Sequence, residues 1–148
     1  MKKLQNLTAL IAVFALITAL LCGCASDAPQ ATTNDIPDTA GITFDTTETD
    51  FGTGATVFTF EVTNVEGETK SFQVHTDETV VGKALINAGL IAGEDSDYGL
   101  YVKTVMGITL DYDTDGKYWA FYVDGEYAAT GVDQTELNAA STYAFRAE

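Results

Sequence analysis

The stretch KYWAFYVDGEYA, residues 117–128, predicts a β-hairpin, and the rest of the fold can be built outward from it. The dipeptide Asp124-Gly125 separates two β-rich runs, which is the pattern of a two-residue type I′ turn. Side chains of a strand alternate between the two faces of a sheet, so Trp119 and Phe121 share one face. Because both faces of this strand are apolar, we expect it to lie in the centre of a sheet and to organise it.

Residues before and after the hairpin predict further strands. Residues 57–65 and 70–76 alternate between apolar and polar side chains, which predicts two strands joined by a turn at residues 66–68. The acidic run Glu94–Asp97 is predicted to be a solvated loop. Later strands are predicted at residues 98–106, 108–112 and 142–146.

A single helix is predicted between these two groups of strands. Apolar residues recur at helical spacing from Val80 to Ala88. Asp77 or Thr79 could cap the start of this helix, and Gly89 could take the left-handed conformation that ends it. Two strands, one helix and then several strands indicate an α+β fold, a small β-grasp-like domain with one helix on a mostly antiparallel sheet.

The N-terminus predicts export and lipidation. Lys2 and Lys3 precede fifteen apolar residues, 7–21, a length typical of a secretory signal peptide and too short for a comfortable transmembrane helix. The sequence LCGC at residues 21–24 resembles the bacterial lipobox. This resemblance implies that residues 1–23 are a lipoprotein signal peptide and that Cys24 carries a lipid anchor such as palmitate. The alternatives are an ordinary cleaved signal peptide and an uncleaved anchor.

The charge of the chain restricts its partners. The net charge is −15, and loss of Lys2 and Lys3 with the signal peptide would leave five basic residues against 22 acidic ones, a net charge of −17. Such a protein repels nucleic acid and anionic lipid headgroups. We therefore expect no nucleic-acid partner, and attachment to the extracellular face of the cell membrane through the acyl chain alone. Once Cys24 is lipidated no cysteine pair remains, so a disulfide is not expected.

The mature chain is predicted to consist of a tether and one domain. Residues 24–55 contain the lipidated cysteine, both prolines of the chain and much Ala, Thr and Asp, which indicates a flexible stalk. An edge strand at residues 42–44 is the alternative for part of that segment. Residues 56–148 suit a single small domain with one core.

Three motifs and the closing strand are similar to those of a known domain family. The motifs are TVVGKAL at 79–85, YVKTVMG at 101–107 and YWAFYVDG at 118–125, followed by Gly131 and YAF at 143–145. From about Phe58 onward the chain resembles the transcobalamin C-terminal-like domain, which has an uncharacterised bacterial branch on lipoproteins and surface proteins. The resemblance implies the β-grasp-like fold and makes cobalamin, or another corrinoid, a candidate ligand. In the vertebrate carriers a large helical barrel completes the cobalamin site, and these 148 residues contain no such barrel.

The residue types do not favour catalysis. His75 is the only histidine, and strand alternation places it with the polar residues of its strand, so a surface histidine is favoured over a general base. A zinc site normally needs three or four nitrogen or sulfur ligands. We therefore expect that the protein is not an enzyme and requires no cofactor.

The segment DYDTDG, residues 111–116, is a candidate calcium site. Asp111, Asp113 and Asp115 place oxygen ligands at alternate positions before a glycine, as at the start of an EF-hand loop. The match fails later, because Tyr122 stands where a bidentate Glu is required. The favoured alternative is an acidic turn, with weak calcium binding outside the EF-hand fold as the hypothesis to test.

Tyrosines are the candidate ligand-binding residues. Tyr118 and Tyr122 on the outer face of the hairpin strand, with Tyr98 and Tyr101, could form a flat platform edged by hydroxyl groups. Such a platform suits a planar small molecule or a surface protein. The sequence thus favours a membrane-anchored, extracellular ligand-binding or interaction module, with a structural or adhesive cell-envelope domain as the alternative.

Overall fold

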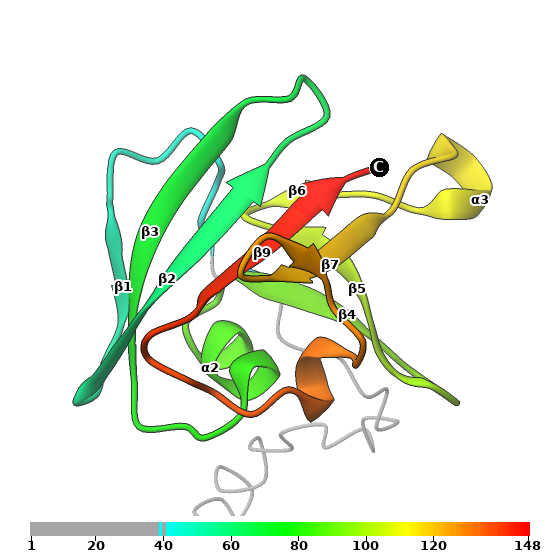
Figure 1. Ribbon diagram of the computed structural model, residues 1–148. Helices are drawn as coiled ribbons and strands as arrows, with labels where there is room; N and C mark the ends of the chain where they lie inside the picture. The colour runs from blue at the N-terminus through cyan, green and yellow to red at the C-terminus, as the bar shows by residue number, and fades with distance from the viewer. Residues whose placement is uncertain (1–38, 40) are drawn as a thin grey trace, which may run out of the picture. The chain divides into compact units, whose positions relative to one another are not determined.

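The computed structural model describes Thr39 and residues 41–148, which form an α+β domain, as predicted (Figure 1). The predicted signal peptide, the predicted lipidation site Cys24 and most of the predicted stalk lie outside the described residues. Within the described part, no helix is long and apolar enough to cross a membrane.

The larger sheet has six strands in the described part of the chain, in the order β1-β3-β2-β9-β7-β8. The pairs β2–β3, β7–β9 and β7–β8 are antiparallel, whereas β2–β9 and β1–β3 are parallel. The parallel pairing of β2 with the last strand, β9, is the central feature of this sheet. Its strands are β1 (Asp50–Gly52), β2 (Thr56–Thr63), β3 (Thr69–Thr76), β7 (Trp119–Val123), β8 (Glu126–Tyr127) and β9 (Thr142–Ala147).

The smaller sheet is an antiparallel three-stranded sheet in the order β4-β5-β6. Its strands are β4 (Ile91–Ser96), β5 (Gly99–Val105) and β6 (Ile108–Thr109). Three short helical segments connect the strands, namely α2 (Val81–Asn87), α3 (Tyr112–Asp115) and the 3₁₀ turn η1 (Val132–Gln134).

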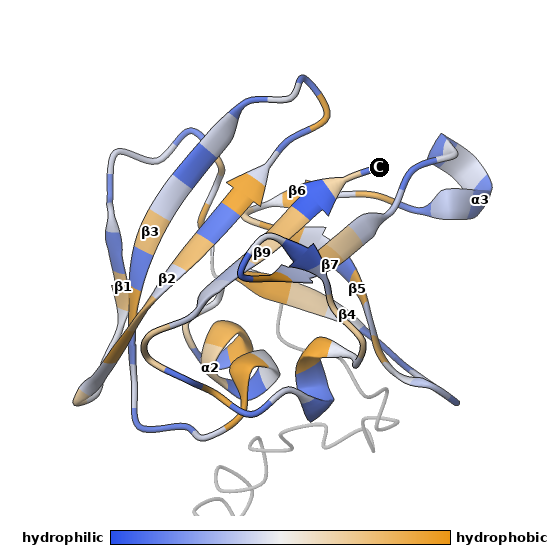
Figure 2. Ribbon diagram, viewed as in Figure 1, coloured by the Kyte–Doolittle hydropathy of each residue, from blue (hydrophilic) through white to orange (hydrophobic). Residues whose placement is uncertain are grey.

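One hydrophobic core joins the inner faces of both sheets and α2. Phe58, Phe60 and Val62 are 1%, 0% and 0% exposed, because every second side chain of β2 points inward. Figure 2 shows this alternation as hydrophobic and hydrophilic segments along β2. Leu85 from α2 and Val105 from β5 are also completely buried and belong to the same cluster.

The hairpin predicted at residues 117–128 is confirmed, but its place in the sheet is not central. Asp124 and Gly125 have φ angles of 50° and 85°, as a type I′ turn requires. However, β8 is the edge strand beside β7, and the centre is formed by β2 and β9. The last strand takes the central place because Tyr143 and Phe145, both 1% exposed, pack into the core between β2 and β7.

The predicted helix is present, and its C-terminus has the predicted form. Gly89 has a φ of 70°, its N–H donates to Ile86 O, and the N–H of Leu90 donates to Leu85 O, which is a Schellman motif. The prediction that Asp77 or Thr79 caps the N-terminus was wrong. Instead, the segment before β9 satisfies the helix start, because the N–H of Val81 donates to the carbonyl of Thr135.

The predicted flexible stalk ends earlier than Ala55. Phe44 and Phe51 are 5% and 6% exposed and belong to the core cluster, and residues 50–52 form β1 at the edge of the larger sheet. This segment was not predicted as part of the domain, because a three-residue edge strand is too short to show a periodic pattern of apolar side chains. The domain therefore includes residues that the prediction had assigned to the tether.

Two further strand boundaries differ from the predictions. Residues 94–96 of the predicted loop are paired in β4, where their side chains stay exposed while the backbone pairs with β5. The strand predicted at residues 108–112 is shortened to β6, because Asp111 caps the one-turn helix α3 by accepting a hydrogen bond from the N–H of Asp113.

Candidate functional site

An aromatic groove lies between β5 of the smaller sheet and the β7–β8 hairpin of the larger one. Its volume is about 370 Å³, which falls within the range of small-molecule sites. Six aromatic side chains line it, and the segment 128–132 completes its wall. These side chains are Tyr101 from β5, Tyr118 just before β7, Trp119 and Phe121 from β7, Tyr127 from β8 and Phe145 from β9.

Trp119 connects the groove to the core. Its side chain is only 5% exposed, and its indole Nε1–H donates to the carbonyl of Ile108 at 3.2 Å. This burial agrees with the strand alternation that places Trp119 on the face opposite the outer side chains Tyr118 and Tyr122. Trp119 also lines the groove. Its packing in the core therefore holds one wall of the candidate site in place.

The rim of the groove is more exposed and carries phenol hydroxyls. Tyr101 and Tyr127 are 37% and 61% exposed. The neighbouring Tyr127, and to a smaller extent burial, raises the pKa of Tyr118 above its usual value. The hydroxyl of Tyr118 therefore stays protonated at neutral pH and can donate a hydrogen bond to a ligand.

The structure brings together two of the four predicted ligand-binding tyrosines. Tyr101 and Tyr118 both line the aromatic groove. Tyr98, which is 92% exposed, lines an adjacent hollow of about 400 Å³ that shares Tyr101 with the groove.

Tyr122 has a different environment from the other three predicted tyrosines. Its ring lies under the Arg146 guanidinium at 4.1 Å and packs edge-on against Tyr127, and its hydroxyl donates to Glu148. The hydrogen bond to Glu148 is the main cause that raises the pKa of Tyr122. Tyr122 therefore supports the rim residue Tyr127 and does not itself line the groove.

Two residues that line the groove, Trp119 and Tyr127, were not among the four predicted ligand-binding residues. The only signal for Tyr127 was its place two residues after the type I′ turn. In a two-residue hairpin that position faces Tyr122 across the strands, as the observed pairing shows.

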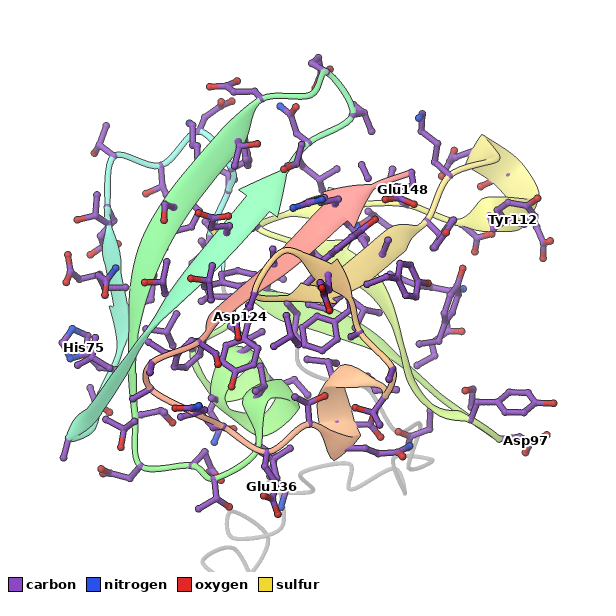
Figure 3. The ribbon with its side chains drawn as sticks, viewed as in Figure 1. His75, Asp97, Tyr112, Asp124, Glu136 and Glu148 are labelled. Carbon is purple, nitrogen blue, oxygen red and sulfur yellow. The ribbon has the colours of Figure 1, made fainter. Side chains whose placement is uncertain are left out.

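A second hollow of the described region has a different character. It measures about 620 Å³ and lies between β1, the end of β3 and α2. Several of its polar side chains already form hydrogen bonds within the protein. Asn87 donates to Glu78 at 2.8 Å, and Asp77 accepts from the N–H of Ala55 at 2.9 Å. His75 projects from β3 beside β1, away from the core, and lies 3.5 Å from Asp50 (Figure 3). We favour the aromatic groove because it offers apolar surface with few polar groups.

The predicted calcium residues are engaged with the protein itself. Asp111 pairs with Lys103 at 2.9 Å, and Asp115 accepts from the N–H of Asp111 at 2.8 Å. The ammonium of Lys103, and then the N–H of Asp113, holds the pKa of Asp111 below its usual value. Among residues 41–148 and Thr39, no three His, Cys, Asp or Glu side chains converge as metal ligands. The geometry is that of an acidic turn.

Calcium binding at Asp111, Asp113 and Asp115 stays a prediction that calorimetry can test. A divalent cation would have to displace Lys103 from Asp111, so we expect binding weaker than about millimolar. Heat of binding and a thermal shift at lower calcium concentrations, both lost in Asp113→Asn, would show that the turn rearranges around a metal.

Part of this chain is similar to a described domain family. Residues 77–146, just under half of the chain, match the family model "Domain of unknown function (DUF4430)". A search of curated proteins finds no match.

Two solved structures are similar to the domain. A protein from Ruminococcus gnavus ATCC 29149, described as a candidate metal binding protein, is 26% identical with a TM-score of 0.59, and the match covers 64% of this chain and 97% of that one. Haptocorrin in complex with Cbi is 19% identical with a TM-score of 0.51, and the match covers 66% of this chain and 26% of haptocorrin. The domain therefore shares its fold with a part of haptocorrin, which confirms the fold that the transcobalamin resemblance implies.

Proposed function

We propose that this protein is a non-catalytic ligand-binding module whose aromatic groove receives a small molecule. The observation that carries the proposal is the groove itself, which gathers Tyr101, Tyr118, Trp119, Phe121 and Tyr127 around about 370 Å³. Aromatic faces with hydroxyl groups at the rim suit a ligand that is flat and has polar edges.

A corrinoid is the first ligand to test. The fold likeness to a part of haptocorrin, a protein solved in complex with Cbi, supports this choice. A corrin is a broad plane edged with amides, and the Tyr rings and hydroxyls of the groove match those two features. Because one small domain can cover only one face of such a ligand, we expect a micromolar or weaker affinity unless a second protein completes the site.

The proposed location is the extracellular face of the cell membrane, through a lipid on Cys24. The proposal rests on the lipobox-like LCGC after the apolar run at residues 7–21. Metabolic labelling with an acyl probe should mark the wild-type chain and Cys22→Ala, but not Cys24→Ala. Lipid labelling that persists in Cys24→Ala would disprove the assignment.

Equilibrium dialysis tests the ligand proposal. A fragment from Asn34 to Glu148 keeps the complete core cluster and is checked first for cooperative thermal unfolding. Cobinamide and cobalamin are then dialysed against it at high micromolar protein, and we expect retention of at least one of them. Tyr127→Leu should reduce retention, whereas Tyr112→Leu should not. Both tyrosines are 61% exposed, but only Tyr127 lines the groove.

Lack of retention by a folded fragment would remove the corrinoid from the proposal. Equal loss in both variants would show that retention depends on general surface properties and not on the groove. In that case the structural or adhesive envelope domain would become the better account.

A further inference from the structure

The lining of the aromatic groove combines π-faces with an absence of charged side chains. None of the described residues that line it is Asp, Glu, Lys or Arg. The face of an aromatic ring is electron-rich and attracts cations, with Trp the strongest and Tyr next. A groove built from one Trp and three Tyr therefore favours a cation that needs no hydrogen-bond partner.

The chain already uses two of its tyrosine rings in this way. The guanidinium of Arg146 lies 4.1 Å from the ring centroid of Tyr122, and Lys103 Nζ lies 5.8 Å from that of Tyr101. The charge of Lys103 is more than balanced, because it pairs with both Glu94 at 3.2 Å and Asp111 at 2.9 Å. The surroundings of Tyr101 thus remain net negative beside the groove.

A carboxylate stands directly behind one wall of the groove. A Cβ at Gly131, which lines the groove, would lie 2.7 Å from Asp133 Oδ1. This oxygen is buried and has no hydrogen-bond partner among the described residues. Asp133 as a whole is half-buried, but this oxygen is sheltered from solvent and unpaired, so its negative charge acts on the groove through the glycine wall.

The electrostatic field of the whole domain is also negative. Residues 41–148 contain nineteen acidic and five basic residues, a net charge of −14. A cleft lined by low-dielectric groups focuses such a field and raises the local concentration of counter-ions. The long-range field, the carboxylate behind Gly131 and the ring faces all favour a positively charged ligand.

We propose that the aromatic groove selects an organic cation, with a quaternary ammonium group seated against Trp119 between Tyr101 and Tyr127. The inference rests on the proposed function, since it concerns the same groove, and it specifies the charge of the ligand. A volume of about 370 Å³ accommodates a trimethylammonium head and a short stem. The binding energy comes from cation–π contact and from the negative potential of the wall.

A matched pair of probes isolates the charge. Choline and 3,3-dimethyl-1-butanol have nearly the same shape, but only choline carries a positive charge. Trp119 is the only tryptophan of the chain and lines the groove, so its fluorescence reports occupancy directly. The full-length chain in a maltoside detergent is titrated with each probe. We expect choline to bind at least about tenfold more tightly than the neutral alcohol, a ratio that corresponds to about 1.4 kcal/mol.

Three variants and the salt dependence of binding test whether the preference for choline arises in the groove. Asp133→Asn should weaken choline binding several-fold, and Tyr127→Leu should weaken choline binding by a larger factor than it weakens binding of the neutral probe. Tyr98→Leu is the control, because Tyr98 is 92% exposed and lies outside the groove. Raising the ionic strength from about 0.01 M to about 1 M shortens the Debye length from about 30 Å to about 3 Å and should weaken choline alone.

The outcomes separate this inference from the proposed function. Equal affinities for choline and the neutral alcohol would overturn the selection for cations while leaving the groove as a ligand site. A lack of response to either probe would also overturn it, and corrinoid retention by dialysis would then decide the proposed function independently. Choline binding that Tyr127→Leu does not weaken would overturn the placement in the groove.

Discussion

Replacement of Trp119 by alanine perturbs the core and the groove together. The side chain is 5% exposed, and removal of a large buried aromatic typically costs about 3–5 kcal/mol. The carbonyl of Ile108 also loses the indole N–H that donates to it at 3.2 Å. A small domain has about 5–15 kcal/mol of stability in total, so Trp119→Ala should lose a large share of it.

Thermal unfolding followed by circular dichroism measures this loss. At about 4 °C per kcal/mol for a domain of this size, Trp119→Ala should lower Tm by more than about 10 °C. Trp119→Phe keeps most of the apolar volume and loses the hydrogen bond, so its loss should be intermediate. Tyr112→Ala is the control, because its ring is 61% exposed.

An unchanged Tm in Trp119→Ala would refute this reasoning. It would mean that Trp119 contributes little to the core and that the wall of the groove is not held rigidly. A loss in Trp119→Phe as large as that in Trp119→Ala would instead assign the effect to the hydrogen bond with Ile108.

Three further predictions concern the rest of the domain. A fragment that begins at Thr56 lacks β1 and Phe51, which is 6% exposed, so it should unfold at a lower temperature than one that begins at Asn34. Gly82→Ala should lower stability by about 1–3 kcal/mol, as for overpacking, because the new Cβ would lie 2.9 Å from the backbone of η1; unchanged denaturant midpoints would contradict this. Asp111 has its pKa lowered below 3.8, mainly by Lys103, so its contribution is complete above that pH and is lost as pH falls through the lowered value. Unfolding curves of wild type and Asp111→Asn should therefore differ at pH 7 and converge in acid.

Local patterns were sufficient to predict most of the elements. The alternation along β2 and β3, the Schellman motif at Gly89 and the turn at Asp124-Gly125 each depend on neighbours in sequence, so they could be predicted. The parallel pairing of β2 with β9 joins segments about 80 residues apart, and no local signal specifies it. The sequence-based prediction therefore placed the hairpin strand at the centre of the sheet, where the structure has β2 and β9.

The candidate site was only partly predictable for the same reason. Tyr101 and Tyr118 were predicted as aromatic candidates, but the groove exists because β5 comes to lie beside β7, in a different sheet. Tyr122 was chosen because it shares a strand face with Tyr118, whereas in the structure it packs against Arg146 and Tyr127. Strand alternation gives the face of a side chain and does not show which neighbours cover it.

The measurement that tests the central claim most directly is a two-dimensional ¹H–¹⁵N NMR titration of the folded chain with cobinamide and, separately, with choline. The single indole N–H of Trp119 and the amides of Tyr101, Tyr127 and Gly131 report on the groove. If the groove is the ligand site, these signals shift together and saturate, while the amide of His75 beside the larger hollow stays unchanged. Shifts confined to the surroundings of His75, or no saturable shifts at all with either compound, would contradict the assignment of the aromatic groove as the ligand site.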